Sequence, residues 1–154
     1  MEKSIVCGVD GSADSEAALA VAARLADRLG ADLVLANVVE YVPSPYATIG
    51  AVGPGSGARA AHADVLGEQV RAGERLLEEM AEEANVETAD RRVVSGFAAE
   101  RLADLADEED AELIVVGSRG RGAFKAAFLG SVSTSLIGVA RCPVLVVPPG
   151  ARES

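Results

Sequence analysis

The chain has 154 residues, which is enough for one domain with a buried core. Hydrophobic residues make up 49% of it but aromatic residues only 3%, so the core must consist mainly of Ala, Val, Leu and Ile. The formal net charge of −10 argues against a general nucleic-acid binder, because such proteins present a basic face. No apolar run approaches the length of a membrane helix, and the first four residues lead into a short strand rather than a signal peptide. We therefore expect a cytoplasmic protein that binds neither nucleic acid nor membranes.

The first third of the chain alternates strand and helix patterns. Residues 4–9 are apolar on both faces, which is typical of a parallel strand covered by helices. A turn follows, in which Ser12 or Asp14 caps a helix that ends at Gly30. Residues 33–39 form the second predicted strand. The next stretch is rich in Pro and Gly, and we expect a mobile loop at about 40–58, with a nucleotide lid as the alternative.

The rest of the chain continues the alternation. We predict a helix at about 60–85, a strand at 87–94, a helix at 97–109 and a strand at 113–116, and then, after a glycine loop, a helix at 131–139 and a strand at 144–147. Such alternation predicts an α/β fold with a doubly wound, five-stranded parallel sheet and helices on both faces. It is expected to form a single domain over residues 1–150, followed by a short tail at 151–154.

The glycine loop is the most specific pattern in the sequence. It consists of Gly117, two residues, Gly120, nine residues, Gly130 and then Ser131. Glycines after a strand let the backbone approach a ligand closely, and the helix that follows presents free N–H groups and a positive dipole end to an anion. The spacing is neither that of a Walker A loop nor that of a dinucleotide fingerprint. We expect the N–H groups of the three glycines to face ribose and phosphate; a structural turn without a ligand is the alternative.

Other residues of the loop fit the same interpretation. Ser131 and Ser133 are expected to donate hydroxyl hydrogen bonds to phosphate oxygens, and Val132 shares the N-terminus of their helix. Ser131 could instead serve only as a helix cap. Arg119 and Arg121 either neutralise phosphate charge or remain solvated.

These patterns resemble the ATP-binding branch of the universal stress protein family, which carries G-x2-G-x9-G-[ST]. Further matches lie at residues 9–12, 37–39 and 142–147, so the resemblance covers nearly the whole chain. It implies the strand order 3-2-1-4-5 of the adenine-nucleotide α-hydrolase-like fold. In that order the ends of the first and fourth strands, with Asp10 and Gly117, meet where ligands bind in such sheets.

The resemblance also implies a ligand and further site residues. The ligand would be ATP, or ADP or AMP, with Mg or Mn as the metal. Asp10 would line the pocket, accepting from adenine or ribose or helping to hold the metal, unless it only caps the turn. Val38 and Val39 would pair with the adenine edge through their backbone, although by sequence alone they are strand residues.

The leading functional interpretation is a nucleotide-dependent stress-response and regulatory protein that acts on a protein partner of unknown identity. We expect at most slow ATP hydrolysis, because the sequence has no Walker A lysine and no general base at a recognisable position. One alternative is a nucleotide-cleaving enzyme of the related α-hydrolase group, for which 154 residues leave little room. The other is an interaction module that binds no nucleotide. A homodimer through an edge strand at Val144–Val147 is expected from its apolar sequence and from the family resemblance.

Overall fold

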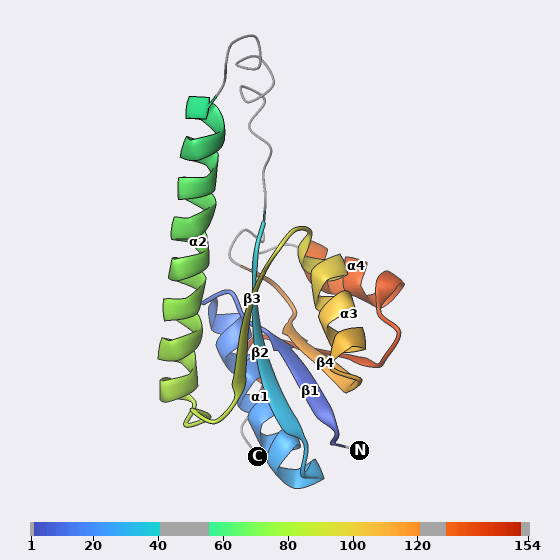
Figure 1. Ribbon diagram of the computed structural model, residues 1–154. Helices are drawn as coiled ribbons and strands as arrows, with labels where there is room; N and C mark the ends of the chain where they lie inside the picture. Colours follow the sequence, from blue (N-terminus) through green and yellow to red (C-terminus); the bar gives the residue numbers. More distant parts are fainter. Residues whose placement is uncertain (1, 41–55, 121–128, 152–154) are drawn as a thin grey trace.

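The fold is a five-stranded parallel sheet with helices on both faces (Figure 1). The computed structural model describes residues 2–40, 56–120 and 129–151, with side chains in the long second helix described from residue 63 onward. The strand order is β3-β2-β1-β4-β5, which confirms the predicted fold class and order. The elements are β1 (Ser4–Gly8), α1 (Ala13–Leu29), β2 (Asp32–Val39), α2 (Ser56–Glu83), β3 (Asp90–Ser95), α3 (Ala98–Glu108), β4 (Ala111–Gly117), α4 (Ser131–Val139) and β5 (Val144–Val147).

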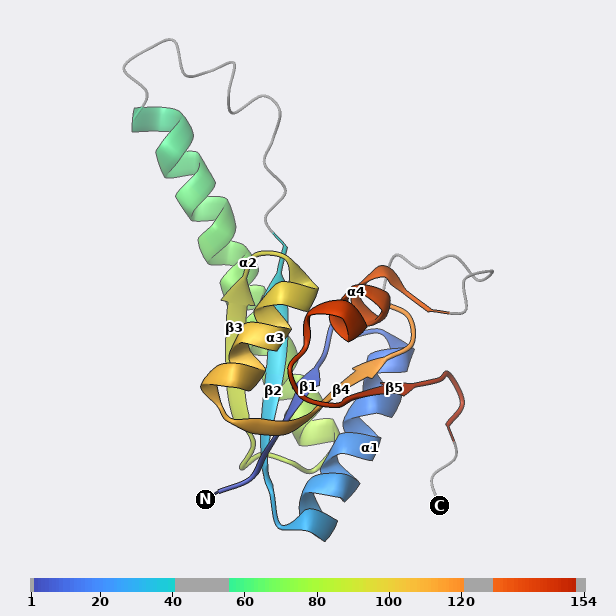
Figure 2. The same cartoon turned by 90° about the vertical axis from the view of Figure 1, so that its right-hand side faces the viewer.

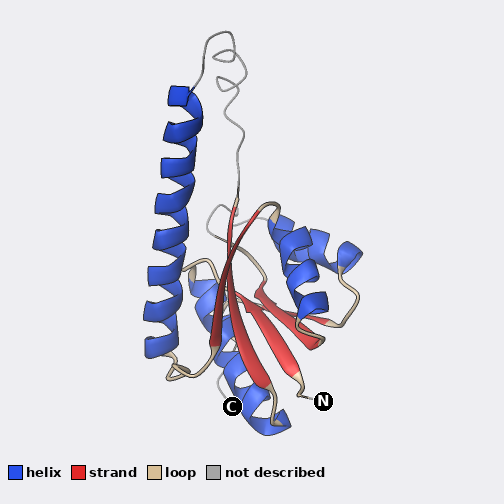
Figure 3. Cartoon of the chain, viewed as in Figure 1, coloured by secondary structure: helices blue, strands red, loops and turns tan. Residues whose placement is uncertain are grey.

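Two hydrophobic cores lie on the two faces of the sheet. Helices α1 and α2 cover one face, and α3 and α4 cover the other (Figures 2 and 3). The composition predicted an aliphatic core, and the largest fully buried side chains are indeed Ile5, Leu19, Leu35, Leu77, Ile114 and Leu136. Cys7 lies in the middle of β1 as a free thiol, and its burial raises its pKa to about 12. This thiol therefore behaves as a small apolar core group.

Local signals explain where α1 begins and ends. The Ser12 hydroxyl accepts the N–H of Ser15 at 3.2 Å, which satisfies one of the free donors of the first turn. Gly30 ends the helix in the left-handed conformation with φ of 62°, where a side chain would be strained. Both predicted boundaries of this helix are confirmed.

Two predicted boundaries differ from the structure by three or more residues. Helix α2 begins at Ser56, so residues 56–58 of the predicted loop are helical, while residues 41–55 lie outside the described part of the chain. Strand β3 begins at Asp90 rather than at residue 87, because the chain first has to close α2. Asn85 takes a φ of 55°, and the N–H of Val86 returns to the carbonyl of Ala81 at 2.8 Å. A second turn follows, in which the N–H of Ala89 donates to the carbonyl of Val86 at 2.9 Å, and it uses residues 87–89, which the sequence pattern had placed in the strand.

Among the described side chains of α2, those packed closely on the sheet lie in its C-terminal half. Its buried residues are Gly73, Leu77, Met80 and Ala81, whereas residues 63–72 have none, and that half of the helix extends beyond the sheet (Figures 1 and 2). Close packing depends on Gly73, because a Cβ there would lie 2.7 Å from Oδ1 of Asn37 and 3.1 Å from Cγ1 of Val93. No helix among the described residues is both long enough and apolar enough to cross a membrane.

Gly73→Ala should destabilise the fold even though Ala favours a helix. The new methyl group would push α2 away from β2 and β3, at a cost of about 1–3 kcal/mol, which outweighs the helix propensity gain of about 1 kcal/mol. Gly67→Ala on the same helix is the matched control, because its Cβ would meet only the end of the Arg71 side chain at 3.6 Å. Urea unfolding should show a loss of stability for the first variant and a gain for the second. Equal gains in both would contradict the close approach at Gly73.

Candidate functional site

A cleft of about 620 Å³ opens at the carboxyl ends of the strands. It lies where the order of the sheet reverses, since β1 is flanked by β2 on one side and by β4 on the other. It is lined by Gly8, Val9, Asp10, Ser15, Ala36, Val38, Glu40, Ala98, Leu102, Val116, Gly117, Ser118, Arg119, Gly120, Leu129, Gly130, Ser131, Val132 and Ser133. The predicted location of the site and this cleft coincide.

The lining of the cleft is divided into an apolar and a polar part. Ala36 and Val38 of β2, Leu102 of α3 and Val116 of β4 supply aliphatic surface. The loop after β4 and the first turn of α4 supply backbone and hydroxyl groups. A ligand that fits both parts needs a flat or apolar portion and an anionic portion.

The N-terminus of α4 opens into the polar part of the cleft. Its N-cap residue is Gly130, which has no side chain to cap the helix. The N–H groups of Ser131, Val132 and Ser133 occupy the first helical positions, which have no acceptor inside a helix. Helix α1 is different, because Ser12 caps it. The first turn of α4 is therefore the arrangement that favours an anion at this place.

Ser118 joins three elements beneath this turn. Its N–H donates to the carbonyl of Val147 at 2.8 Å, and its hydroxyl donates to Oδ2 of Asp14 at 3.0 Å. Its carbonyl accepts the N–H of Gly130 at 2.6 Å and the hydroxyl of Ser133 at 3.1 Å. The residue is almost completely buried, with 4% of its surface exposed. It thus ties β5, α1 and α4 to the end of β4, and the sequence analysis did not single it out.

These bonds correct two expectations. The N–H of Gly130 does not face a ligand, because it donates to Ser118. The Ser133 hydroxyl also donates within the protein, to the carbonyl of Ser118 or that of Gly130, each at 3.1 Å. Both residues still line the cleft, Gly130 by leaving room and Ser133 with the backbone of the helix.

Two motif glycines have packing roles of their own. A Cβ on Gly117 would lie 2.7 Å from the carbonyl carbon of Asp14, so its absence lets α1 approach the end of β4. A Cβ on Gly120 would lie 2.8 Å from Oδ2 of Asp10. The glycine spacing therefore reflects the construction of the cleft as well as any ligand within it.

The other predicted residues fall into three groups. Asp10 and Arg119 line the cleft, as do all of the remaining predicted site residues except Val39. Val39 is buried and does not line it, and its carbonyl accepts the N–H of Gly96 at 3.0 Å. Arg121 lies outside the described residues.

Charge in the described lining is not predominantly positive. Its charged residues are Asp10, Glu40 and Arg119. Arg119 is already paired, with its Nε 3.4 Å from Oδ2 of the Asp14 carboxylate. Glu40 was missed by the sequence analysis because it follows the second strand without any motif. Among the described residues, an anion at this site would be held mainly by backbone N–H groups.

No cluster of three or more Cys, His or acidic residues suited to a metal ion occurs in the described part of the chain. Asp10 and Glu40 are the carboxylates that line the cleft. Magnesium commonly takes one or two carboxylates and completes its ligands with phosphates and water, so these residues fit a metal that arrives with a nucleotide. Asp10 Oδ1 also accepts the Ser12 N–H at 2.9 Å, which supports its predicted role in the turn.

The family model for the universal stress protein family matches residues 1–148. The chain belongs to the universal stress protein family. A relative from Thermus aquaticus, a universal stress protein in the 3′ region of a QAH/OAS sulfhydrylase, is 32% identical over 151 residues, which cover 96% of this chain and 99% of the relative.

Solved structures of the family share the fold. Universal stress protein UspA from Lactobacillus plantarum aligns with a TM-score of 0.76 at 19% identity, covering 94% of this chain and 97% of that protein. A universal stress protein solved in complex with cAMP aligns with a TM-score of 0.67 at 25% identity, covering 96% and 98% respectively. The nucleotide in that structure is a property of that relative.

Ser118→Ala should destabilise the protein by about 2 kcal/mol, because it removes a buried hydrogen bond to a carboxylate. Thr134→Ala is the control: its hydroxyl bonds to the Gly130 carbonyl at 2.8 Å on the exposed side of α4, and its loss should cost less than about 1 kcal/mol. Urea unfolding measures both free energies. Equal losses in the two variants would show that the Ser118–Asp14 bond contributes no more to the free energy of unfolding than an exposed hydrogen bond does.

Proposed function

We propose that the cleft binds an adenine nucleotide, ATP in the first place, and that nucleotide occupancy regulates a cytoplasmic stress-response protein. The observation that carries this proposal is the uncapped first turn of α4, which opens into a cleft with an aliphatic wall. Family membership supports it, as does the relative solved with cAMP. ADP and AMP offer the same base and fewer phosphates, and are compared in the same experiments.

Each part of the nucleotide has a proposed counterpart. The phosphates lie at the N–H groups of Ser131, Val132 and Ser133, with the Ser131 hydroxyl as a further donor. The base lies against the aliphatic wall, with the backbone of Val38 at its polar edge. Asp10 accepts from the ribose or helps to hold Mg or Mn bound to the phosphates.

Binding rather than turnover is the proposed activity. The sequence has no Walker A lysine, and phosphoryl transfer depends on such positioned charges. We therefore expect at most slow hydrolysis. An adenine-nucleotide-cleaving enzyme and an interaction module without nucleotide are the competing functions, and the following measurement separates them from the proposal.

The first test is to purify the protein without added nucleotide, denature it and identify any released compound by mass spectrometry. Calorimetry with ATP and Mg²⁺ then measures binding to the nucleotide-free protein. ATP or ADP released in near-stoichiometric amount, or calorimetric binding, supports the proposal, while rapid formation of AMP would favour the cleaving enzyme. A protein that is empty and does not bind ATP contradicts the proposal and favours the interaction module.

Gly130→Leu should weaken ATP binding at least about tenfold, or about 1.4 kcal/mol. A Cβ at this position already lies 3.3 Å from both Cα of Arg119 and the carbonyl oxygen of Ser118, so a larger side chain must displace the first turn of α4. Gly138→Ala in the same helix is the control, because nothing lies within 4 Å of its Cβ, and it should bind ATP as the wild type does. Calorimetry on folded samples of both variants provides the comparison. Unchanged affinity in Gly130→Leu would place the nucleotide elsewhere.

We also propose that the protein is a homodimer through β5 and the adjoining face of α4. Strand β5 is at the end of the sheet, and residues 129–150 contain a single charged residue, Arg141, which pairs with Asp107 at 3.0 Å. A protein with a net charge of −10 can bring two copies together with least repulsion at such a charge-poor surface. Ile137 adds an apolar side chain to it that is 59% exposed.

Ile137→Asp should shift the protein toward the monomer by placing two carboxylates in the proposed interface. Val65→Asp is the matched control, because Val65 is similarly exposed at 57% but lies on α2, away from β5. Light scattering at micromolar concentration should show a dimer for the wild type and the control and a larger monomer fraction for Ile137→Asp. A monomeric wild type would overturn the proposed dimer.

A further inference from the structure

The outer edge of β3 is a second place where the described sheet has no neighbouring strand. β3 stands at one end of the order β3-β2-β1-β4-β5 and pairs only with β2. A parallel edge strand directs alternate N–H and C=O groups outward, where they are available to another chain. With six residues β3 is longer than β5, and most of its residues are exposed. This edge lies at the opposite end of the sheet from the proposed dimer surface.

A groove runs between this strand and α2. It has a volume of about 270 Å³ and is lined by Val70, Glu74, Leu77, Glu78, Arg91 and Val93. The aliphatic residues form its apolar part, while Glu74 and Glu78 are one helical turn apart on α2. Among the ion pairs of the described residues, none involves Glu74, Glu78 or Arg91.

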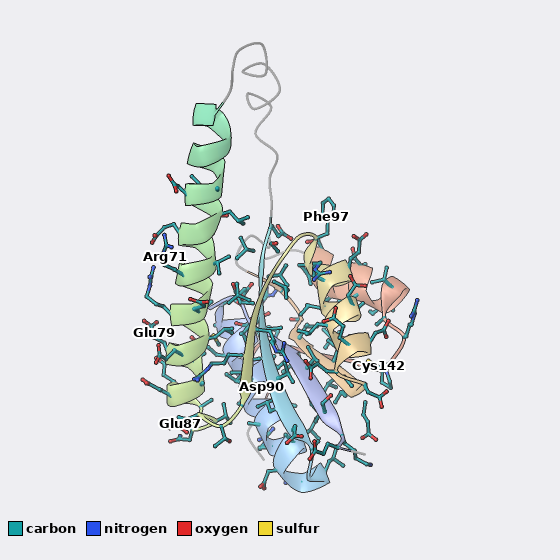
Figure 4. The ribbon with its side chains drawn as sticks, viewed as in Figure 1. Arg71, Glu79, Glu87, Asp90, Phe97 and Cys142 are labelled. Carbon is teal, nitrogen blue, oxygen red and sulfur yellow. The ribbon has the colours of Figure 1, made fainter. Side chains whose placement is uncertain are left out.

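The region around the groove is strongly acidic. Residues 64–92 contain nine acidic and four basic residues, a net charge of −5, which is half that of the whole chain. Three of the four arginines are paired: Arg71 and Arg75 with Glu68, and Arg92 with Glu109. Arg71 and Glu79 lie on the side of α2 away from the sheet (Figure 4). The groove itself is lined by two carboxylates, Glu74 and Glu78, and by one arginine, Arg91, so its net charge of −1 and its acidic surroundings favour a basic partner.

A second copy of this chain is a poor occupant of the same edge. Two-fold pairing of β3 with β3 in a continuous sheet would place the α2 helices of both copies side by side on one face. Glu74 and Glu78 of each copy would then face a second acidic helix. Like charges across an interface oppose association, so the groove selects a different chain.

We propose that the β3 edge and the α2–β3 groove bind an extended, basic segment of another protein by strand addition. The main chain of the segment pairs with the outward N–H and C=O groups of β3. Because side chains alternate along a strand, every second residue of the segment faces α2. These residues alternate between an aliphatic side chain over the half-buried Val70 and Val93 and a Lys or Arg beside Glu74 and Glu78. This surface is separate from the nucleotide cleft and gives the regulatory protein a place to hold its partner.

The test uses the full-length protein and a fluorescein-labelled peptide, acetyl-Lys-Thr-Val-Thr-Lys-Thr-Val-amide, in which Lys and Val share one face. Fluorescence anisotropy measures its affinity at low ionic strength and again at about 0.3 M salt. Glu74→Lys combined with Glu78→Lys should weaken binding about tenfold or more. Glu82→Lys combined with Glu83→Lys changes the net charge equally at exposed positions of α2 outside the groove, and should bind within about twofold of the wild type.

Two backbone-modified peptides test strand addition itself. One carries N-methyl groups at its odd residues and the other at its even residues. Pairing with a single strand edge uses only one of these sets of N–H groups, so one modified peptide should lose binding and the other should keep it. The proposal is overturned if no peptide binds below about 1 mM, a millimolar Kd being only about 4 kcal/mol of binding free energy. It is also overturned if both charge variants weaken binding equally, or if both methylated peptides bind like the parent.

Discussion

The carboxyl edge of the sheet depends on the hydrogen bonds of one buried residue, Ser118. Its three polar groups reach β5, α1 and α4, and Asp14 receives both its hydroxyl and the N–H of Arg119. A buried carboxylate is stable only when it is hydrogen-bonded, so α1 and the loop after β4 are mutually dependent. The first turn of α4 rests on the same residue through the 2.6 Å bond from Gly130. Ser118 thus fixes the orientation of the first turn of α4, and with it the direction of the N–H groups that open into the cleft.

Gly117 and Gly120 have a packing role in this arrangement in addition to any role in binding a ligand. Gly117 allows α1 to pack against the end of β4, and Gly120 leaves room for the Asp10 carboxylate. Both would be needed to form the cleft even if nothing were bound in it. The glycine spacing alone consequently does not separate a binding protein from an empty module. The feature that favours a ligand is the uncapped N-terminus of α4, because no hydrogen bond among the described residues uses the N–H groups of Ser131, Val132 and Ser133.

Charge divides the surface of the protein into distinct regions. As far as the described residues form it, the cleft offers N–H groups beside two carboxylates and one paired arginine. The α4–β5 side has almost no charge, whereas residues 64–92, from α2 into β3, carry half of the net negative charge. The two free edges of the sheet therefore differ in chemistry: the apolar one suits self-association, and the acidic one suits a basic chain. A nucleotide, a second copy and a protein partner would each have a surface of their own.

The sequence determined the order of elements and most of the cleft. Apolar runs, glycine punctuation and the Gly117–Ser131 spacing are local signals, and they identified all five strands and the helix at Ser131–Val139. Nine of the ten predicted site residues line the cleft, and Val38 among them was predicted from the family resemblance. The start of β3 was misplaced because a turn at Asn85 depends on how α2 closes, which periodicity does not reveal.

Only the tertiary structure decided which polar groups remain available to a ligand. Ser118, Asp14 and Val147 are far apart in the chain, and nothing local in their sequence indicates that they meet. The carbonyl of Ser118 accepts the N–H of Gly130 and the hydroxyl of Ser133, so these two donors are used within the protein. The carbonyl of Val39 accepts the N–H of Gly96, which directly follows β3. Hydrogen-bond partners are fixed by the packing of distant elements, whereas sequence patterns report on near neighbours along the chain.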